Sequence, residues 1–286
     1  MRGGRLFAKA VSAALVFCAL ASPPAAGQDA KRGEYIFNAA GCYSCHTQDK
    51  PPGPPLAGGR GIKTPFGIFY GPNITPDLEH GLGKWSEVDF VRAVREGASP
   101  AGDSYYPVFP FPSYAGMTDQ DLKDLWAYLR SIPPAKQPDK PHELNFPFNM
   151  RMSAWGWQLL FFDPEPFRPD PKQSAEWNRG AYLVRHLGHC GECHTPRDMF
   201  GVPKADKFLA GNPDVPKAPN ITPLPKSGIG DWRKADLVSF LKDGMLPDGD
   251  IVGGEMSDVI NENTSKLTDE DRAAIATFIL SLPPTQ

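Results

Sequence analysis

The sequence has 286 residues, with 30 lysines and arginines against 33 aspartates and glutamates, which gives a formal charge of −3 at pH 7. This nearly neutral balance argues against nucleic-acid binding, which a strongly basic surface would indicate. The 28 glycines and 32 prolines predict a structure rich in loops.

The N-terminus has the pattern of a secretory signal peptide. Basic residues, Arg2 and Arg5 among them, precede an apolar run at 10–21, and small residues then lead to a cleavage site before Gln28. The run is too short to span a bilayer, which takes ~20 apolar residues. We therefore predict a signal peptide at 1–27 and a periplasmic location.

Two pentapeptides, at 42–46 and 190–194, have the sequence Cys-x-x-Cys-His, which is typical of covalent haem c attachment. Two thiols three positions apart on a helical turn can each form a thioether to one vinyl group of the porphyrin. The following histidine then lies beneath the iron as a ligand. We predict two covalently bound haem c groups, with Cys42, Cys45, Cys190 and Cys193 as attachment points and His46 and His194 as iron ligands.

Other chemistry is also compatible with single parts of this pattern. A lone Cys-x-x-Cys is found in zinc sites and dithiol redox centres, but two copies, each followed by histidine in an exported chain, favour haem. The fifth cysteine, Cys18, lies within the signal peptide. A lipid-modified Cys18 is an alternative that the bulky Phe17 before it disfavours. The mature chain then has no cysteine for a disulfide.

The chain contains one unit twice. The segment at 72–76, Pro-Asn-Ile-Thr-Pro, recurs at 219–223, and Gly-Leu-Gly-Lys-Trp at 81–85 matches Gly-Ile-Gly-Asp-Trp at 228–232. Both pairs are 147 residues apart (219 − 72 and 228 − 81), too far for a solenoid, whose repeats span ~20–50 residues. We predict duplicated domains at 28–134 and 174–286.

Helical spacing of apolar residues predicts three helices in each copy. They lie at 31–40, 86–96 and 118–131 in the first copy and at 175–187, 234–243 and 268–282 in the second. No stretch shows the alternation that would predict a strand. The predicted fold class is therefore all-α.

The segment between the copies, 135–173, is rich in proline and aromatic residues. A flexible linker would instead be rich in glycine, serine or charge. We expect this interdomain strap to pack across both domains and fix their orientation. The alternative is a docking surface for a partner protein.

With both haem motifs and the repeated loops in hand, the chain resembles the dihaem cytochrome c subunits of periplasmic dehydrogenases, over essentially the whole mature sequence. Those of alcohol and gluconate dehydrogenases are similar by motif, as are cytochromes that accompany molybdenum-dependent aldehyde or hydroxylating dehydrogenases. The resemblance implies two tandem class I cytochrome c domains and a role in electron transfer rather than catalysis. The implied partners are a dehydrogenase catalytic subunit and a downstream cytochrome, quinone or terminal oxidase, with peripheral membrane association through a complex.

The sixth iron ligand of the second haem is predicted to be Met256. It follows three residues, Gly-Gly-Glu, and lies 11 residues (267 − 256) before Leu267 at the start of the last helix. This arrangement resembles the methionine-ligand loop of the family. The competitor, Met245, aligns with Ala98 of the first copy and is expected to be structural.

The first copy departs from that pattern, because the position equivalent to Met256 is Phe109 (256 − 147). A phenylalanine has no lone pair for iron. Met117, His80 and His142 remain as alternative ligands, and an iron without a sixth protein ligand is a further alternative.

Two functions follow from these residues. The leading hypothesis is an electron-transfer subunit that is not itself an enzyme. The alternative is a haem enzyme or ligand-binding protein, peroxidase-like or thiosulfate-oxidising, that uses an open iron position on the first haem. The prolines and apolar residues around Phe109 are poor groups for activating peroxide and disfavour the alternative.

Overall fold

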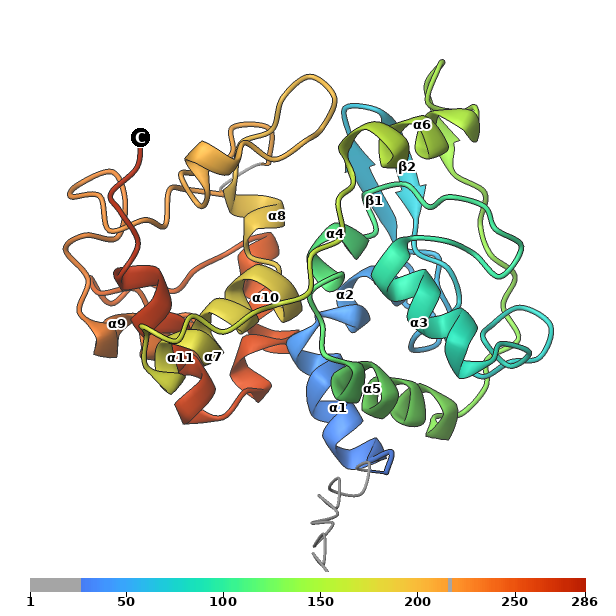
Figure 1. The fold of residues 1–286 in the computed structure, drawn as a ribbon, viewed down its shortest axis with the longest axis horizontal. Coiled ribbons are helices and arrows are strands. Elements are labelled where there is room, and N and C mark those ends of the chain that lie inside the picture. The colour runs from blue at the N-terminus through green and yellow to red at the C-terminus, as the bar shows by residue number, and fades with distance from the viewer. Residues whose placement is uncertain (1–26, 216–217) are drawn as a thin grey trace, which may run out of the picture.

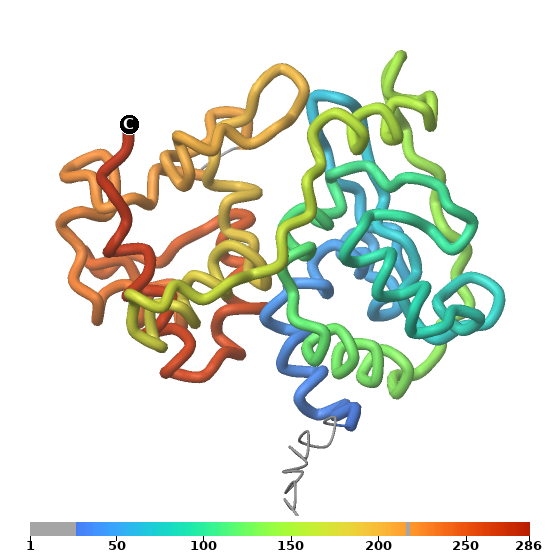
Figure 2. The backbone as a smooth tube through the Cα atoms, in the orientation of Figure 1, coloured from blue at the N-terminus to red at the C-terminus, as the bar shows by residue number. Residues whose placement is uncertain are grey.

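A computed structural model describes residues 27–215 and 218–286 of the protein. The predicted signal peptide lies outside the described residues, except for Gly27 at its end. The helices of the first half of the chain gather on one side of the molecule and those of the second half on the other (Figure 1). We call the predicted interdomain strap, 135–173, the connecting segment. It crosses between the two groups, as the tube drawing also shows (Figure 2).

The helices of the first half are α1 (Ala30–Ala39), α2 (Cys42–His46), α3 (Glu87–Glu96), α4 (Phe111–Tyr114) and α5 (Asp119–Ser131). Helix α6 (Met152–Phe161) belongs to the connecting segment. The second half contains α7 (Ala175–Tyr182), continued by a π-helical turn at Leu183–Leu187, then α8 (Gly191–His194), α9 (Lys234–Asp243), α10 (Glu255–Glu262) and α11 (Asp269–Leu280). All six predicted helices are confirmed, with ends that differ by at most two residues. None of the helices in the described ranges has the length and apolar character needed to cross a bilayer.

The ends of matching helices are set by the same local chemistry. Thr118 and Thr268 are the N-caps of α5 and α11, and each hydroxyl accepts the backbone N–H three positions later. Gly97 and Gly244 end α3 and α9 with φ of 63° and 77°, a left-handed conformation that glycine adopts without steric cost. The duplication therefore extends to the capping interactions.

Two glycines allow the first and last helices of each half to pack closely. A Cβ atom on Gly33 of α1 would lie 1.9 Å from the Asp124 carbonyl oxygen of α5. A Cβ on Gly180 of α7 would lie 2.0 Å from the Ala274 carbonyl oxygen of α11. Any larger residue would push the helices apart.

The all-α prediction is wrong in one respect, because the fold includes a small antiparallel sheet of three strands. Strands β1 (Gly61–Thr64) and β2 (Gly67–Tyr70) form a hairpin, and β3 (Glu143–Leu144) pairs with the start of β2. Each strand has four residues or fewer, too short for a clear alternating pattern. The third strand also comes from the connecting segment, so its pairing is invisible to local sequence analysis.

The connecting segment contacts both halves. Gln158 of α6 donates to the Gly97 carbonyl of the first half at 2.8 Å. Trp157 donates from Nε1 to the Phe200 carbonyl of the second half at 3.0 Å, and the Phe167 ring lies 5.2 Å from that of Tyr182. The segment therefore tethers the two halves to each other.

Helix α6 nevertheless turns large apolar side chains outward. Met152, Trp155, Leu159 and Leu160 are 73%, 57%, 67% and 72% exposed, whereas Ala154 is the buried residue of this helix. We call these four residues the α6 stripe. An amphipathic surface helix would place such residues inward, so the stripe is an exposed patch of the kind that partner proteins cover.

The two halves also meet through a reciprocal pair of hydrogen bonds. Tyr35 of α1 donates to Asp271 of α11 at 2.5 Å, and Tyr182 of α7 donates to Asp121 of α5. Tyr35 and Tyr182 are equivalent in the repeat, and so are the two aspartates. Each hydroxyl also accepts the N–H of the N-cap threonine of the other half. The contact is therefore the same on both sides of an approximate two-fold relation.

An arginine completes each of these pairs. Arg32 donates to Asp121, and Arg179 binds Asp271 through two hydrogen bonds of 2.8 and 2.6 Å. Burial acts to raise the pKa of Asp271, but the hydrogen bonds from Arg179 and Tyr35 outweigh it and the pKa lies below its usual value. Both aspartates are buried, so their carboxyl oxygens depend on these tyrosine and arginine partners for hydrogen bonds.

We predict that Tyr182→Phe and Tyr35→Phe each lower the free energy of unfolding by about 1.5–3 kcal/mol at pH 7, because each removes a hydrogen bond to a charged group. The loss for Tyr182→Phe should be the larger, since Asp121 is 1% exposed and Asp271 is 8% exposed. Denaturant unfolding of the haem-loaded protein measures both losses. Tyr128→Phe is the control, because that hydroxyl has no side-chain hydrogen bond among the described residues, and it should unfold as the wild type does.

The same comparison has a pH dependence. A carboxylate whose pKa is lowered by folding contributes stability above its unfolded pKa of about 3.9 and loses it as the pH falls through the folded value. The difference between wild type and Tyr35→Phe should therefore be complete at pH 7 and shrink below about pH 4. An unchanged difference at acidic pH would contradict the assignment of the Tyr35 bond to an ionised Asp271.

Candidate haem sites

Both Cys-x-x-Cys-His segments form single helical turns in the structure. Cys42 and Cys45 lie in α2. Cys190 is the N-cap of α8, and Cys193 lies within that helix. All four cysteines are free thiols. Each turn therefore has two sulfur atoms available for thioether bonds.

The thiols are held in their neutral form. Burial raises the pKa of Cys42 and of Cys190 to about 12, and burial is also the largest cause that raises the pKa of Cys193 to about 11. Zinc ligands and reactive dithiols function as thiolates and lie in surroundings that lower the pKa. The thiols therefore do not resemble the activated pair of a dithiol redox centre, and the histidine that follows each pair favours haem over zinc.

The histidine that ends each turn is oriented by a proline carbonyl. Nδ1 of His46 lies 2.8 Å from the Pro72 carbonyl oxygen, and Nδ1 of His194 lies 2.8 Å from that of Pro219. A carbonyl only accepts hydrogen bonds, so Nδ1 bears the proton and the lone pair of Nε2 is left for a metal. Burial lowers the pKa of both histidines, which keeps the rings neutral as iron ligation requires.

The repeated Asn-Ile-Thr-Pro loops hold those carbonyls in place. The Asn73 side-chain oxygen accepts from the Thr75 backbone N–H at 2.9 Å and from its hydroxyl at 2.7 Å. Asn220 and Thr222 form the same pair of bonds at 2.8 and 2.7 Å. A rigid loop of this kind fixes the orientation of the histidine ring, as outer groups do at metal sites.

The two turns lie close to the contact between the halves. Helix α10 of the second half packs against α2, and α4 of the first half packs against the π-helical turn that precedes α8. Burial, Glu192 and Glu255 are the larger causes of the raised pKa of Cys193, and Cys45 of the first half is close enough to contribute as well. The two candidate sites are therefore neighbours in one molecule.

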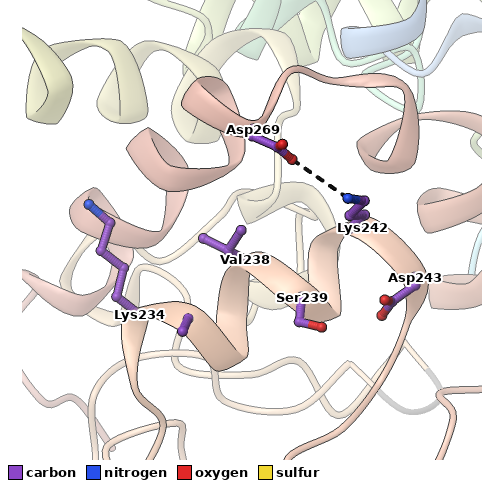
Figure 3. Close-up of a pocket in the computed structure, with 7 residues that line it drawn as sticks. Lys234, Val238, Ser239, Lys242, Asp243 and Asp269 are labelled. Carbon is purple, nitrogen blue, oxygen red and sulfur yellow. Dashed lines mark ion pairs between the residues drawn. The ribbon is translucent and has the colours of Figure 1, made fainter.

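The donor set of each turn fits haem c: two free, neutral thiols on one turn and a neutral histidine whose Nε2 is available. Haem, when bound, supplies reversible one-electron transfer at iron. A surface depression over α9 and the start of α11 has no part in these sites (Figure 3). Its lining contains neither cysteine nor histidine and consists of Lys234, Ala235, Val238, Ser239, Lys242, Asp243 and Asp269.

Comparison with known proteins agrees with this assignment. Residues 30–133 match the cytochrome c family. A dihaem cytochrome c-type protein of Cereibacter sphaeroides is 45% identical over 89% of this chain and 86% of its own length.

The chain belongs to the cytochrome c family.

Other relatives of this cytochrome are longer proteins. The fructose dehydrogenase cytochrome subunit of Gluconobacter japonicus is 40% identical over 88% of this chain and 52% of its own length. The gluconate 2-dehydrogenase cytochrome c subunit of Pantoea cypripedii is 38% identical over 94% of this chain and 63% of its own length. The chain thus spans about half to two thirds of these dehydrogenase subunits. Both of these relatives are named as cytochrome subunits of dehydrogenases.

In the second half of the cytochrome, Met256 is the second residue of α10 and is partly buried. The neighbouring Glu255 contributes to the raised pKa of Cys193, so the start of α10 lies near the second haem motif. Met245 is 47% exposed on the surface. The structure thus favours Met256 over Met245, and iron ligation by Met256 stays a prediction.

In the first half, Phe109 lies among aromatic rings. Its centroid is 5.9 Å from that of Tyr105 and 5.8 Å from that of Tyr114. Met117 immediately precedes the N-cap of α5 and is buried in the same core cluster as Leu122, which lies four residues beyond that cap. This is the arrangement of a hydrophobic staple.

The two candidate histidines of the first half have other partners. Nδ1 of His142 accepts the backbone N–H of Tyr70 at 3.1 Å, and its ring packs edge-on against Phe69 of β2. His80 lies beside Glu79, with Nε2 3.9 Å from its carboxylate. The sixth ligand of the first haem stays an open prediction, with no methionine at the position of Phe109.

Sequence analysis did not single out His189, which lies between the two haem motifs. Its Nε2 is 3.3 Å from the Ala40 carbonyl oxygen of the first half. The haem cysteines are 148 residues apart in the two copies (190 − 42), one more than the repeated loops, so Gly41 is the residue equivalent to His189 (189 − 148). This difference between the copies was the available sequence signal for His189.

We predict that Met256→Ala abolishes the weak near-infrared band of methionine-ligated ferric haem and lowers the potential of one haem, because a thioether ligand favours the reduced iron. Near-infrared absorption and a redox titration measure the two effects. Met245→Ala is the matched control and should change neither. A variant Met256→Ala with the band and both potentials unchanged would show that another residue is the ligand.

Proposed function

We propose that this cytochrome binds two covalent haem c groups and relays single electrons from a dehydrogenase catalytic subunit to a respiratory acceptor in the periplasm. One observation carries the proposal: two Cys-x-x-Cys-His turns, each with its histidine held by a proline carbonyl at 2.8 Å. The dehydrogenase subunits among its relatives support a catalytic partner. The predicted signal peptide supports the location.

The residues around each site suit electron transfer, in which no atoms move and the site should remain rigid. The bond from Nδ1 to the carbonyl fixes the ring plane and strengthens the basicity of Nε2. The surrounding core residues are apolar, and Cys42, Tyr43 and Cys190 pack against them. Such surroundings exclude water, which is one of the factors that set a haem potential.

We propose further that the two haem irons are unequally coordinated. Met256 would complete the second site, whereas Phe109 cannot complete the first. Loss of a thioether ligand lowers the potential, so the first haem would be the more reducing one. Electrons would then pass from the first half, nearer the donor, to the second.

An enzyme that uses the first iron position is less well supported. Tyr105 and Tyr114 flank Phe109, and burial raises the pKa of Tyr105 to about 12. The Tyr114 hydroxyl donates to the Ala40 carbonyl at 2.6 Å, and burial raises its pKa as well. Neither phenol is suited to act as an acid or base near neutral pH.

The α6 stripe supports a protein partner. Helix α6 has no charged residue, and tryptophan and methionine are enriched at the centre of protein interfaces. A helix that binds anionic lipid would instead have lysine and arginine beside its apolar face. We propose that the catalytic subunit covers the stripe and that the cytochrome reaches the membrane through this complex.

The haem content tests the proposed function. Mass spectrometry of the exported protein should show the chain plus two haem groups that acidic acetone does not extract. Cys190→Ala combined with Cys193→Ala should leave one haem, and Cys42→Ala combined with Cys45→Ala should also leave one. A protein that binds zinc and no haem would refute the proposal.

The partner is tested with Trp155→Glu combined with Leu159→Glu. We predict a loss of about 2 kcal/mol or more in binding, roughly 30-fold, because exposed aromatic anchors carry much of an interface. The measurement is the dehydrogenase activity, assayed with an artificial acceptor, that co-purifies with the tagged cytochrome from its native host. Val88→Glu is the control, since Val88 is 75% exposed on α3. Equal co-purifying dehydrogenase activity with the wild type, the double variant and Val88→Glu would exclude the α6 stripe as the docking surface.

A further inference from the structure

The residue immediately before each haem motif adopts the same unusual backbone. Gly41 has φ of 68° and His189 has φ of 36°, and the two are equivalent in the repeat. Glycine adopts the left-handed region freely, whereas a residue with a Cβ atom is strained there. The second half therefore has a histidine where the fold itself favours a glycine.

The imidazole of His189 reaches across to the other half. Its Nε2 lies 3.3 Å from the Ala40 carbonyl oxygen, and its ring packs edge-on against Tyr114 with centroids 5.4 Å apart. The carbonyl only accepts, so Nε2 donates the hydrogen bond. Burial lowers the pKa of His189, which keeps the ring neutral.

This bond joins the two haem motifs by a short path. His189 is bonded directly to Cys190 of the second motif, and Ala40 is separated from Cys42 of the first motif by Gly41 alone. The two halves are also closely packed around Gly41, against Asn263 of the second half. A Cβ atom on Gly41 would lie 2.5 Å from Nδ2 of Asn263, so a histidine at this position of the first half would have to displace the Asn263 side chain.

We infer that His189 is a positioning residue that holds the two haem-attachment turns together and sets the rate of electron transfer between the haems. The inference rests on the proposed two-haem function. The step is a single electron transfer in which one iron is oxidised and the other reduced, with no bond formed or broken. Its rate falls steeply as the separation between the haems grows, so a bond between their attachment turns acts directly on it.

The test is His189→Gly, which removes the imidazole and restores the residue that the first half uses. The variant should still bind two haems, with both potentials unchanged. Relief of backbone strain offsets the lost hydrogen bond, so its stability should be close to that of the wild type. Pulse radiolysis, which delivers one electron to the oxidised protein, should show a several-fold slower exchange between the haems.

His186→Gln is the matched control. His186 is also a half-buried histidine at the contact between the halves, with Nδ1 2.9 Å from the Ser113 carbonyl oxygen, but it does not adjoin a haem cysteine. Its variant should exchange electrons at the wild-type rate.

Three results would overturn the inference: an unchanged rate in His189→Gly, a slower rate that shifted potentials explain, or equal slowing in both variants. Failure to bind two haems in the wild type would instead refute the proposed function, so the two failures are distinguishable.

Discussion

The hydrogen bond from each haem-motif histidine to a proline carbonyl is the interaction on which both sites depend. It fixes the tautomer and the ring plane, and burial keeps the ring neutral. The Asn-Ile-Thr-Pro loops fix the position of that carbonyl. In the first loop the asparagine side-chain oxygen accepts two hydrogen bonds from one threonine. Because loop, carbonyl and histidine recur together, the duplication preserves a complete site rather than a motif alone.

Duplication also supplied the contact between the halves. Tyr35 and Tyr182 donate across it to Asp271 and Asp121, so each half offers the other the same donor and the same acceptor. Such a contact resembles the isologous interface of a homodimer enclosed in one chain. The two halves nevertheless differ at residues close to the haem sites. Phe109 of the first half is equivalent in the repeat to Met256 of the second, and Gly41 is equivalent to His189. The symmetric residues maintain the assembly, and the asymmetric ones can make the two haems unequal.

Much of this structure could be predicted from the sequence, because helices and haem turns are local. Caps such as Thr118 and Thr268 defined helix ends that agree within two residues. The small sheet could not, since its strands are short and β3 lies far along the chain from β2. The tyrosine–aspartate hydrogen bonds between the halves could not be predicted either. Tyr35 and Asp271 are 236 residues apart, and a repeat does not indicate whether equivalent residues pair within a copy or between copies. The outward apolar face of α6 agrees with the docking surface that was the alternative for 135–173, but composition alone could not show which apolar residues of that segment are exposed.

The most direct test of unequal haem coordination is a carbon monoxide titration of the reduced protein, followed by absorption spectroscopy. We predict that one carbon monoxide binds for every two haems, with the spectrum of the second haem unchanged, because Phe109 leaves the first iron without a sixth protein ligand. Phe109→Met should reduce that binding if the loop can present its sulfur. Two low-spin haems that bind no carbon monoxide, one of which becomes high-spin in Met117→Ala, would contradict unequal coordination and identify Met117 as the missing ligand.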